Sequence, residues 1–227
     1  MDKEHYKLLD DKLPIFFKSW WLNAVCEGGE WLADAFERNG GVESVFVCFV
    51  KRKCGLRYIV MPPLTQFLGE YSFVENTLSH SKMASEYFIG NLPKAAFTAI
   101  NMSHTFKYWT PYLWHGFQQT TRYSLKINDL TDVDLVFDNF EESKKRNIRK
   151  AAKSLEIRQN MAGEKFYDFF AAGLMEKGQK PGFSRDLFLN LHSECVAHNA
   201  GTILYTVDSE NVAHGALFVV WDNSAMY

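Results

Sequence analysis

Apolar runs and alternating stretches along the chain predict its strands. The uninterrupted apolar run at residues 45–50 has strand length and β-branched character, which is typical of a strand covered on both faces. A second apolar segment, residues 56–61, ends at Pro62, because proline cannot donate a hydrogen bond to a sheet. Residues 121–128 alternate between apolar and polar side chains, which predicts a half-buried strand. Further strands are expected at residues 95–100, 203–207 and 212–221.

Helical spacing of apolar residues predicts helices between these strands. Residues 14–38 show this spacing, and Gly28 and Gly29 are expected to break the region in two. Ser143 is expected to begin a helix that runs to about residue 155. Ser184 is a suitable N-cap for another helix. Further helices are expected at residues 72–90, 110–117, 165–178 and 184–199, and another is expected to begin at Thr131.

The order of these elements predicts an α/β protein of the α+β kind, with two mixed sheets flanked by helices. The first lobe is expected to span residues 1–158, and a partial second lobe to span residues 159–227. Residues 45–50 are expected at the centre of the first sheet and residues 212–220 at the centre of the second. The chain stops where a strand begins, which would leave an unpaired edge. We therefore expect the natural protein to continue and the second lobe to be incomplete.

Composition excludes several classes of protein. With 47% apolar and 15% aromatic residues, a chain of 227 residues can bury a full core. The net charge of −2 provides no overall basic field for nucleic acid or an anionic membrane, so any recognition of anions must be local.

Cysteine and histidine spacing indicates neither a disulfide framework nor a metal site. Cys26, Cys48, Cys54 and Cys195 show no CxxC spacing, and the seven histidines show no HxH or HExxH spacing. The N-terminus lacks the order of a signal peptide, and no apolar stretch approaches the roughly 18 residues of a membrane span. A reducing compartment, the cytoplasm, is therefore expected.

The segment at residues 143–153 holds six basic residues and no acidic one. On a helix, four of them are spaced i, i+3, i+4 and i+7, which places them on one face. We call these four the basic stripe: Arg146, Arg149, Lys150 and Lys153. The opposite side is expected to pack against the protein through a small apolar face made of Ile148, Ala151, Ala152 and Leu155.

The basic stripe has two interpretations. The first is a solvated helix face, in which the repulsion between the basic side chains is partly compensated by upstream acidic residues, Asp138, Glu141 and Glu142. The second is a face that recognises phosphate, because ordinary solvated faces mix charges and four like charges within two turns repel one another. We favour phosphate recognition, since the arginine fork binds phosphate oxygens bidentately.

Motifs that identify catalytic residues are absent from the sequence. No GxSxG, Walker-type or GxGxxG motif occurs, so no catalytic residue is assigned. Gln119 and Arg122 belong to a polar cluster that enters the alternating strand, which by composition alone is an ordinary strand end.

Two stretches nevertheless resemble a known group. Residues 112–125 read YLWHGFQQTTRYSL, and residues 146–153 read RNIRKAAK. Together they resemble the central region of the GNAT-like, Fem-related transferases. Residues 62–69 and 212–222 are similar to a loop and a hairpin strand of the same group, and the likeness extends from about residue 14 to the end.

This resemblance implies two GNAT-like lobes and transfer of an acyl or aminoacyl group to an amine. Fem enzymes take the group from aminoacyl-tRNA and act on a nucleotide- or lipid-linked cell-wall precursor. Other members are linked to polysaccharide biosynthesis, with an acyl-CoA such as acetyl-CoA as donor. In GNAT lobes the donor pyrophosphate is held just after the strand region where this chain stops, so residues 1–227 alone are expected to be inactive.

The resemblance and the basic stripe together give the candidate substrate-binding residues. These are Gln119, Arg122, Arg146, Arg149, Lys150 and Lys153. Two alternatives remain open: a non-catalytic module that binds a phosphorylated glycan precursor, and an RNA-binding protein that uses the helix at residues 144–153. Turnover with acyl donors separates the first from an enzyme, and a steep salt dependence would mark the second.

Overall fold

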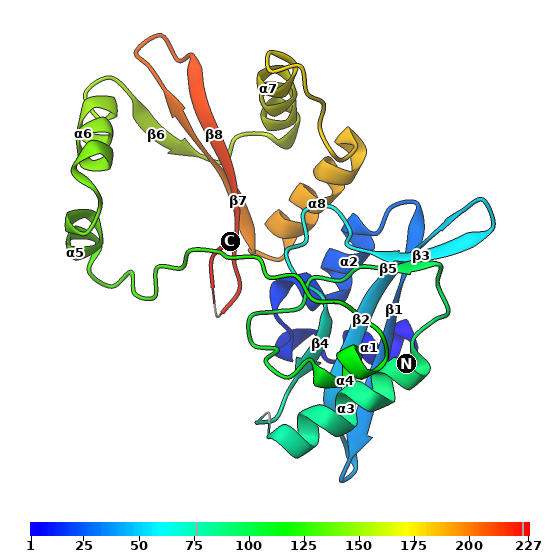
Figure 1. Cartoon of the computed structure of the whole chain (residues 1–227). Coiled ribbons are helices and arrows are strands. Elements are labelled where there is room, and N and C mark those ends of the chain that lie inside the picture. The colour runs from blue at the N-terminus through cyan, green and yellow to red at the C-terminus, as the bar shows by residue number, and fades with distance from the viewer. Residues whose placement is uncertain (76, 224) are drawn as a thin grey trace.

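The computed structural model describes residues 1–75, 77–223 and 225–227. It contains two sheets flanked by helices, as the sequence predicts (Figure 1). The N-terminal part precedes the first sheet and comprises α1 (Lys3–Lys7), the 3-10 turns η1 (Asp10–Lys12) and η2 (Ile15–Phe17), and α2 (Ser19–Val25).

The first sheet is mixed. Its strands are β1 (Gly29–Arg38), β2 (Gly41–Lys53), β3 (Leu56–Val60), β4 (Gly69–Ser72) and β5 (Phe97–Thr98). The order is β1-β2-β3-β5, β4 also pairs with β2, and only the β3–β5 pair is parallel. Strand β2 therefore has partners on both sides, which confirms residues 45–50 at the centre of this sheet.

Strand β2 is also covered on both faces, because its side chains alternate between two cores. Val45, Val47 and Phe49 pack in the core that includes α1 and α2. Phe46 and Cys48 pack on the other side. There the covering helices are α3 (Leu78–Asn91), with buried Phe88, and α4 (Thr110–Trp114), with buried Tyr112.

The helix expected beyond Gly28 is wrong, since residues 29–38 form strand β1. Gly28 has a φ of 71°, which turns the chain out of α2 and into the sheet. Trp31 then packs in one core and Leu32 in the other, so the side chains follow a period of two. Aromatic spacing alone does not separate this pattern from a helix.

The second sheet is antiparallel. Its strands lie in the order β6 (Glu156–Gln159), β7 (Gly201–Val207) and β8 (Ala213–Val220). Within the described residues β7 is central and β8 lies at an edge, so the central position expected for residues 212–220 is wrong. The short polar strand β6 was not expected; it crosses the boundary expected between residues 158 and 159, and that division into domains stays a prediction.

Helices α7 (Gly163–Met175) and α8 (Arg185–Ala197) pack beside the second sheet. Ser184 accepts a hydrogen bond from the backbone N–H of Leu187, which confirms it as the N-cap of α8. The core beneath α2 includes Leu191 of α8 and Val220 of β8, so one apolar cluster joins the two sheets. The backbone N–H of Ile15 also donates to Asp222 across 2.9 Å.

The half-buried strand expected at residues 121–128 is wrong. No strand is assigned there in the described chain, and Tyr123 and Leu125 are 94% and 102% exposed. Two helices follow, α5 (Val133–Asp138) and α6 (Glu142–Ala151), and they stand apart from both sheets in Figure 1. Alternation marks a segment suited to a sheet, but burial requires a neighbouring strand to pair with.

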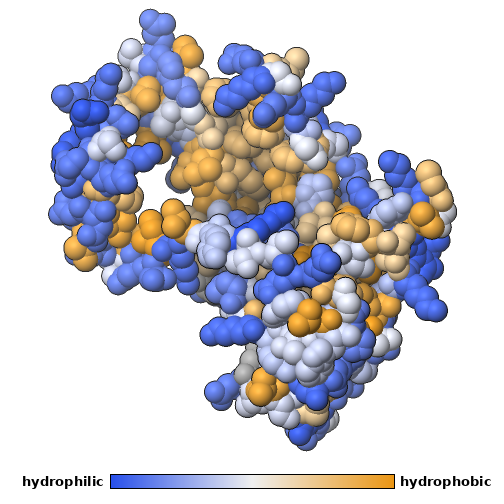
Figure 2. All heavy atoms as spheres, in the orientation of Figure 1, coloured by the Kyte–Doolittle hydropathy of each residue, from blue (hydrophilic) through white to orange (hydrophobic). Residues whose placement is uncertain are grey.

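The packing expected for the apolar side of α6 is also wrong. This helix has no buried residue, and Ile148 is 44% exposed. The second sheet likewise leaves Ile157 and Leu217 exposed. Figure 2 shows apolar surface in a hollow beside the region of α5 and α6.

Candidate functional site

The residues of the basic stripe lie at the surface on or next to α6. Arg146, Arg149 and Lys150 are on this helix and Lys153 follows it, and all four side chains are exposed. The guanidinium of Arg149 lies 5.4 Å from the centre of the Phe137 ring, which holds the side chain against α5. The acidic residue Glu142 pairs with Lys145 at 2.5 Å, and no described ion pair reaches the stripe. Glu142 also lies near enough to Arg149 to interact with it electrostatically, so the positive charge of the stripe is only partly compensated within the described chain.

Gln119 and Arg122 lie elsewhere, in the exposed segment between α4 and α5. No hydrogen bond or ion pair among the described residues connects them to the stripe. Neither residue lines the cavity between the first sheet and α3 or the hollow beside the β2–β3 hairpin. The structure thus places three stripe residues on α6 and Lys153 directly after it, and it leaves Gln119 and Arg122 separate. Substrate binding by all six residues stays a prediction.

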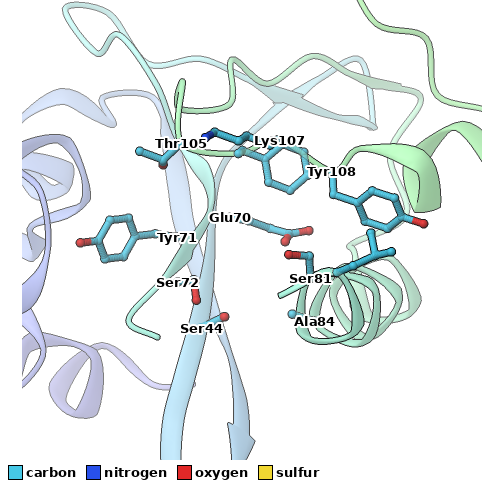
Figure 3. A pocket seen from close by; sticks show the side chains of 11 residues that line it. Ser44, Glu70, Tyr71, Ser72, Ser81, Ala84, Thr105, Lys107 and Tyr108 are labelled. Atoms are coloured by element: carbon cyan, nitrogen blue, oxygen red, sulfur yellow. The ribbon is translucent and has the colours of Figure 1, made fainter. Parts of the chain in front are cut away.

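A cavity of about 340 Å³ lies between the first sheet and α3. Strand β2 contributes Ser44, β4 contributes Glu70 and Ser72, and α3 contributes Ser81. The loop before α4 closes another side with residues 105–108. Figure 3 shows the Glu70 carboxyl group pointing from the sheet toward α3, with Ser81 directed toward it.

Glu70 is buried at 8% exposure and holds three elements together. The hydroxyl of Tyr112 on α4 donates to Oε1 at 2.5 Å, and the hydroxyl of Ser85 on α3 donates to Oε2 at 3.0 Å. Burial raises the pKa of Glu70 to about 7, although these two hydrogen bonds oppose the shift. The same contact and burial raise the pKa of Tyr112 above its ordinary value.

Gly69 positions Glu70 at the start of β4. Its φ is 89°, which side chains other than glycine rarely adopt. A Cβ at this position would lie 2.1 Å from Sδ of Met102, so a larger residue would also require this side chain to move. This glycine lets the chain enter β4 with Glu70 facing α3.

His80, Glu43 and Ser44 form a second polar group beside the cavity. Nε2 of His80 lies 3.4 Å from Oε2 of Glu43 and 3.5 Å from the Ser44 hydroxyl. Both partners share one ring nitrogen, whereas a relay from a nucleophile through histidine to an acid uses both nitrogens. Nδ1 is buried and has no hydrogen-bond partner among the described residues. This arrangement therefore does not activate Ser44 as a nucleophile.

A second hollow of about 320 Å³ lies beside the β2–β3 hairpin, next to the start of β1. Arg52 and Arg57 line it and stand opposite one another in the strand register. Like charges in this position repel. Glu30 also lines the hollow, and no described ion pair joins it to either arginine. The two exposed guanidinium groups are suited to binding an anion from solvent.

The described chain lacks two features, a cluster of metal ligands and a helix suited to crossing a membrane. No group of three or more His, Cys, Asp or Glu side chains is placed to hold a metal ion. None of the helices in the described ranges has both the length and the apolar character needed to cross a bilayer.

Comparison with known proteins gives a match in structure alone. No protein-family model and no curated protein matches the chain. The crystal structure of FemX matches it with a TM-score of 0.54 and 15% sequence identity. The match covers 91% of this chain and 56% of the FemX chain. The chain has a FemX-like fold.

Coverage of 91% means that the likeness to FemX includes both sheets and is not confined to one of them. It confirms the Fem-like fold expected from residues 112–125 and 146–153. The chain spans slightly more than half the length of FemX. At 15% identity the likeness shows the fold alone.

Sequence reasoning missed Glu70 because nothing local distinguishes it. The segment Gly69–Ser72 contains one carboxylate in a short strand, which is common at a sheet surface. Its partners Ser85 and Tyr112 lie 15 and 42 residues away and on two different helices. The available signal was the glycine immediately before it, which marks a position of close backbone approach.

Proposed function

We propose that this protein is an acyltransferase of the Fem-like and GNAT-like type. It transfers an acyl or aminoacyl group to an amine of a nucleotide- or lipid-linked sugar or other cell-envelope precursor. The observation that carries the proposal is the FemX-like fold across both sheets. The stretches at residues 112–125 and 146–153 support it independently, because they resemble the same group in sequence.

The chemistry of such a transfer is compatible with the residues present. Acyl transfer to an amine depends mainly on holding donor and acceptor together and on polarising the carbonyl through backbone N–H groups. It requires no conspicuous side-chain triad, and His80 with Ser44 does not supply one. The donor is acyl-CoA, such as acetyl-CoA, or aminoacyl-tRNA, and we place the reaction in the cytoplasm, within envelope or polysaccharide biosynthesis.

The basic stripe is the proposed phosphate-binding element of this enzyme. Arg146, Arg149 and Lys150 are exposed on α6 and Lys153 is exposed directly after it, and none of the four forms an ion pair among the described residues. Both donor classes and both acceptor classes carry phosphate groups, so an exposed row of cations suits either substrate. Gln119 and Arg122 are the further proposed contacts of the substrate.

Mass spectrometry of the acceptor tests the transfer directly. The protein expressed from its complete gene is incubated with acetyl-CoA or with aminoacyl-tRNA and a UDP-linked amino sugar or muropeptide. We expect the acceptor to gain one acyl or aminoacyl group with one of the donors. Saturable binding of the acceptor without any mass gain across the donor panel would instead favour the non-catalytic binding module.

A further inference from the structure

Glu70 is a buried carboxyl group without a counter-ion. No lysine, arginine or histidine nitrogen of the described residues lies within ion-pair distance of it, and its hydrogen-bond donors are the neutral hydroxyls of Tyr112 and Ser85. Removing a carboxylate from water is costly unless a cation accompanies it. Burial without a cation is therefore the unusual feature of this site.

The carboxyl group has unused capacity to accept hydrogen bonds toward the cavity. Each oxygen of an ionised carboxylate has two lone pairs, and the two described donors use one on each oxygen. Glu70 lines the cavity, so a ligand inside can reach the group. The nearest candidate cation of the protein, Lys107, lines the same cavity but points its amino group away from Glu70 (Figure 3).

The cavity has the size and lining of a small-molecule site. A volume of about 340 Å³ lies within the range of roughly 300–1,000 Å³ that is typical of ligand pockets. The Ser81 hydroxyl points toward Glu70, and Thr105 adds a second hydroxyl to the lining. Apolar walls come from Leu78, Ala84 and Phe106. A hydroxyl oxygen can accept a hydrogen bond from an ammonium group with the same geometry as a carboxylate oxygen, but the bond is weaker.

We propose that this cavity binds a small ligand that carries a primary ammonium group, with Glu70 as its counter-ion. The ammonium donates to Glu70 and to the Ser81 hydroxyl, and the body of the ligand lies between Leu78 and Phe106. An amino sugar or an amino acid amide has the required size and charge. The proposal does not depend on the transfer reaction, because it concerns binding at a site apart from the basic stripe.

Binding of D-glucosamine by the 227-residue chain tests this assignment, with N-acetyl-D-glucosamine as its neutral counterpart. Ethanolamine and glycinamide, with N-acetylethanolamine and N-acetylglycinamide, extend the comparison to smaller ligands. Titration calorimetry near neutral pH, where these amines still carry their proton, should show saturable binding of at least one amine and none of its acetylated form. Glu70→Gln should weaken that binding by about tenfold or more, because a charge-assisted hydrogen bond is lost.

Two further variants distinguish a loss of binding from a loss of folding. Ser81→Leu fills the cavity without altering Glu70 and should also abolish binding. Glu86→Gln changes an exposed carboxylate on α3 that pairs with Lys82, and it should leave binding within about twofold. Cooperative thermal unfolding of each variant establishes that it is folded. Equal binding by the wild type and Glu70→Gln, equal binding of acetylated ligands, or no binding of any amine would overturn the proposal.

Discussion

Tyr112 donates a hydrogen bond to Glu70 across 42 residues of chain and so ties α4 to the edge of the first sheet. Ser85 completes the connection from α3. The stability of this face of the sheet therefore depends on the charge of one buried carboxyl group.

Stability should depend on pH through Glu70. Its pKa is about 7 in the folded state against 4.5 for the free group, so the fold favours the protonated form. Below pH 4.5 Glu70 is protonated in both the folded and the unfolded protein, and its full contribution to the free energy of unfolding is present. As the pH rises toward 7 the unfolded chain releases the proton first, and the free energy of unfolding falls. The loss is on the order of 3 kcal/mol, since each pKa unit corresponds to about 1.4 kcal/mol.

Urea denaturation at a series of pH values measures this loss. The Glu70→Gln variant should lack most of the decrease, because glutamine does not titrate and can still hydrogen-bond to both hydroxyls. His80 and Lys107 lie near the same site and remain unchanged in the variant, so the difference between the two curves isolates Glu70. A wild-type profile that the variant reproduces would assign the pH dependence to other groups.

Tyr112→Phe should destabilise the protein by about 1–3 kcal/mol. The variant keeps the ring that packs against Phe106 and Phe117 but removes the hydroxyl donor from a buried acceptor. Chemical denaturation at neutral pH provides the measurement. Tyr87→Phe is the matched control, because its hydroxyl contacts Asp34 at 3.5 Å at the surface and should contribute little.

Gly69→Ala should be among the most destabilising small substitutions in the first sheet. The added Cβ would overlap Met102, and alanine would also be held at a φ of 89°. The melting temperature should fall by several degrees, and adding Met102→Ala should restore only part of it, because backbone strain remains. Gly40 has a φ of 79° with open space around it, so Gly40→Ala measures the destabilisation that comes from the backbone conformation alone.

The centre of the first sheet could be predicted from residues 45–50, because a continuous β-branched run requires cover on both faces. Strand β1 could not be predicted in this way, since Trp31 and Phe36 also fit helical spacing. Only the pairing with β2 decides between a strand and a helix. The segment at residues 121–128 shows the converse: its alternation suits a strand, yet no described strand pairs with it.

The two candidate sites also differ in whether the sequence predicts them. The basic stripe is a local pattern on one helix, so spacing along the chain was sufficient to place Arg146 and Arg149 together on α6. The Glu70 site is assembled from two strands, two helices and a loop. A cluster of this kind depends on how the elements pack, and spacing along the chain contains no direct signal of it.

Arg149→Ala should weaken binding of a phosphorylated ligand by about tenfold or more while leaving the fold nearly unchanged. Binding should weaken because the variant loses a charge-assisted hydrogen bond to phosphate, which contributes roughly 1.5–3 kcal/mol to the binding free energy in a partly buried complex. The fold should persist, because α6 buries no side chain and Arg149 contacts Phe137 at the surface. Calorimetric titration with a UDP-linked amino sugar measures the first effect and thermal unfolding the second.

The type of cation distinguishes phosphate recognition from a solvated face. Arg149→Lys should recover only part of the binding, because the ammonium keeps the charge but lacks the planar fork that holds two phosphate oxygens. Lys180→Ala removes one charge from an exposed position after α7 and should have no effect on binding. If Arg149→Ala and Lys180→Ala behave alike, the stripe is a solvated surface. If Arg149→Lys restores binding fully, the stripe acts through charge alone.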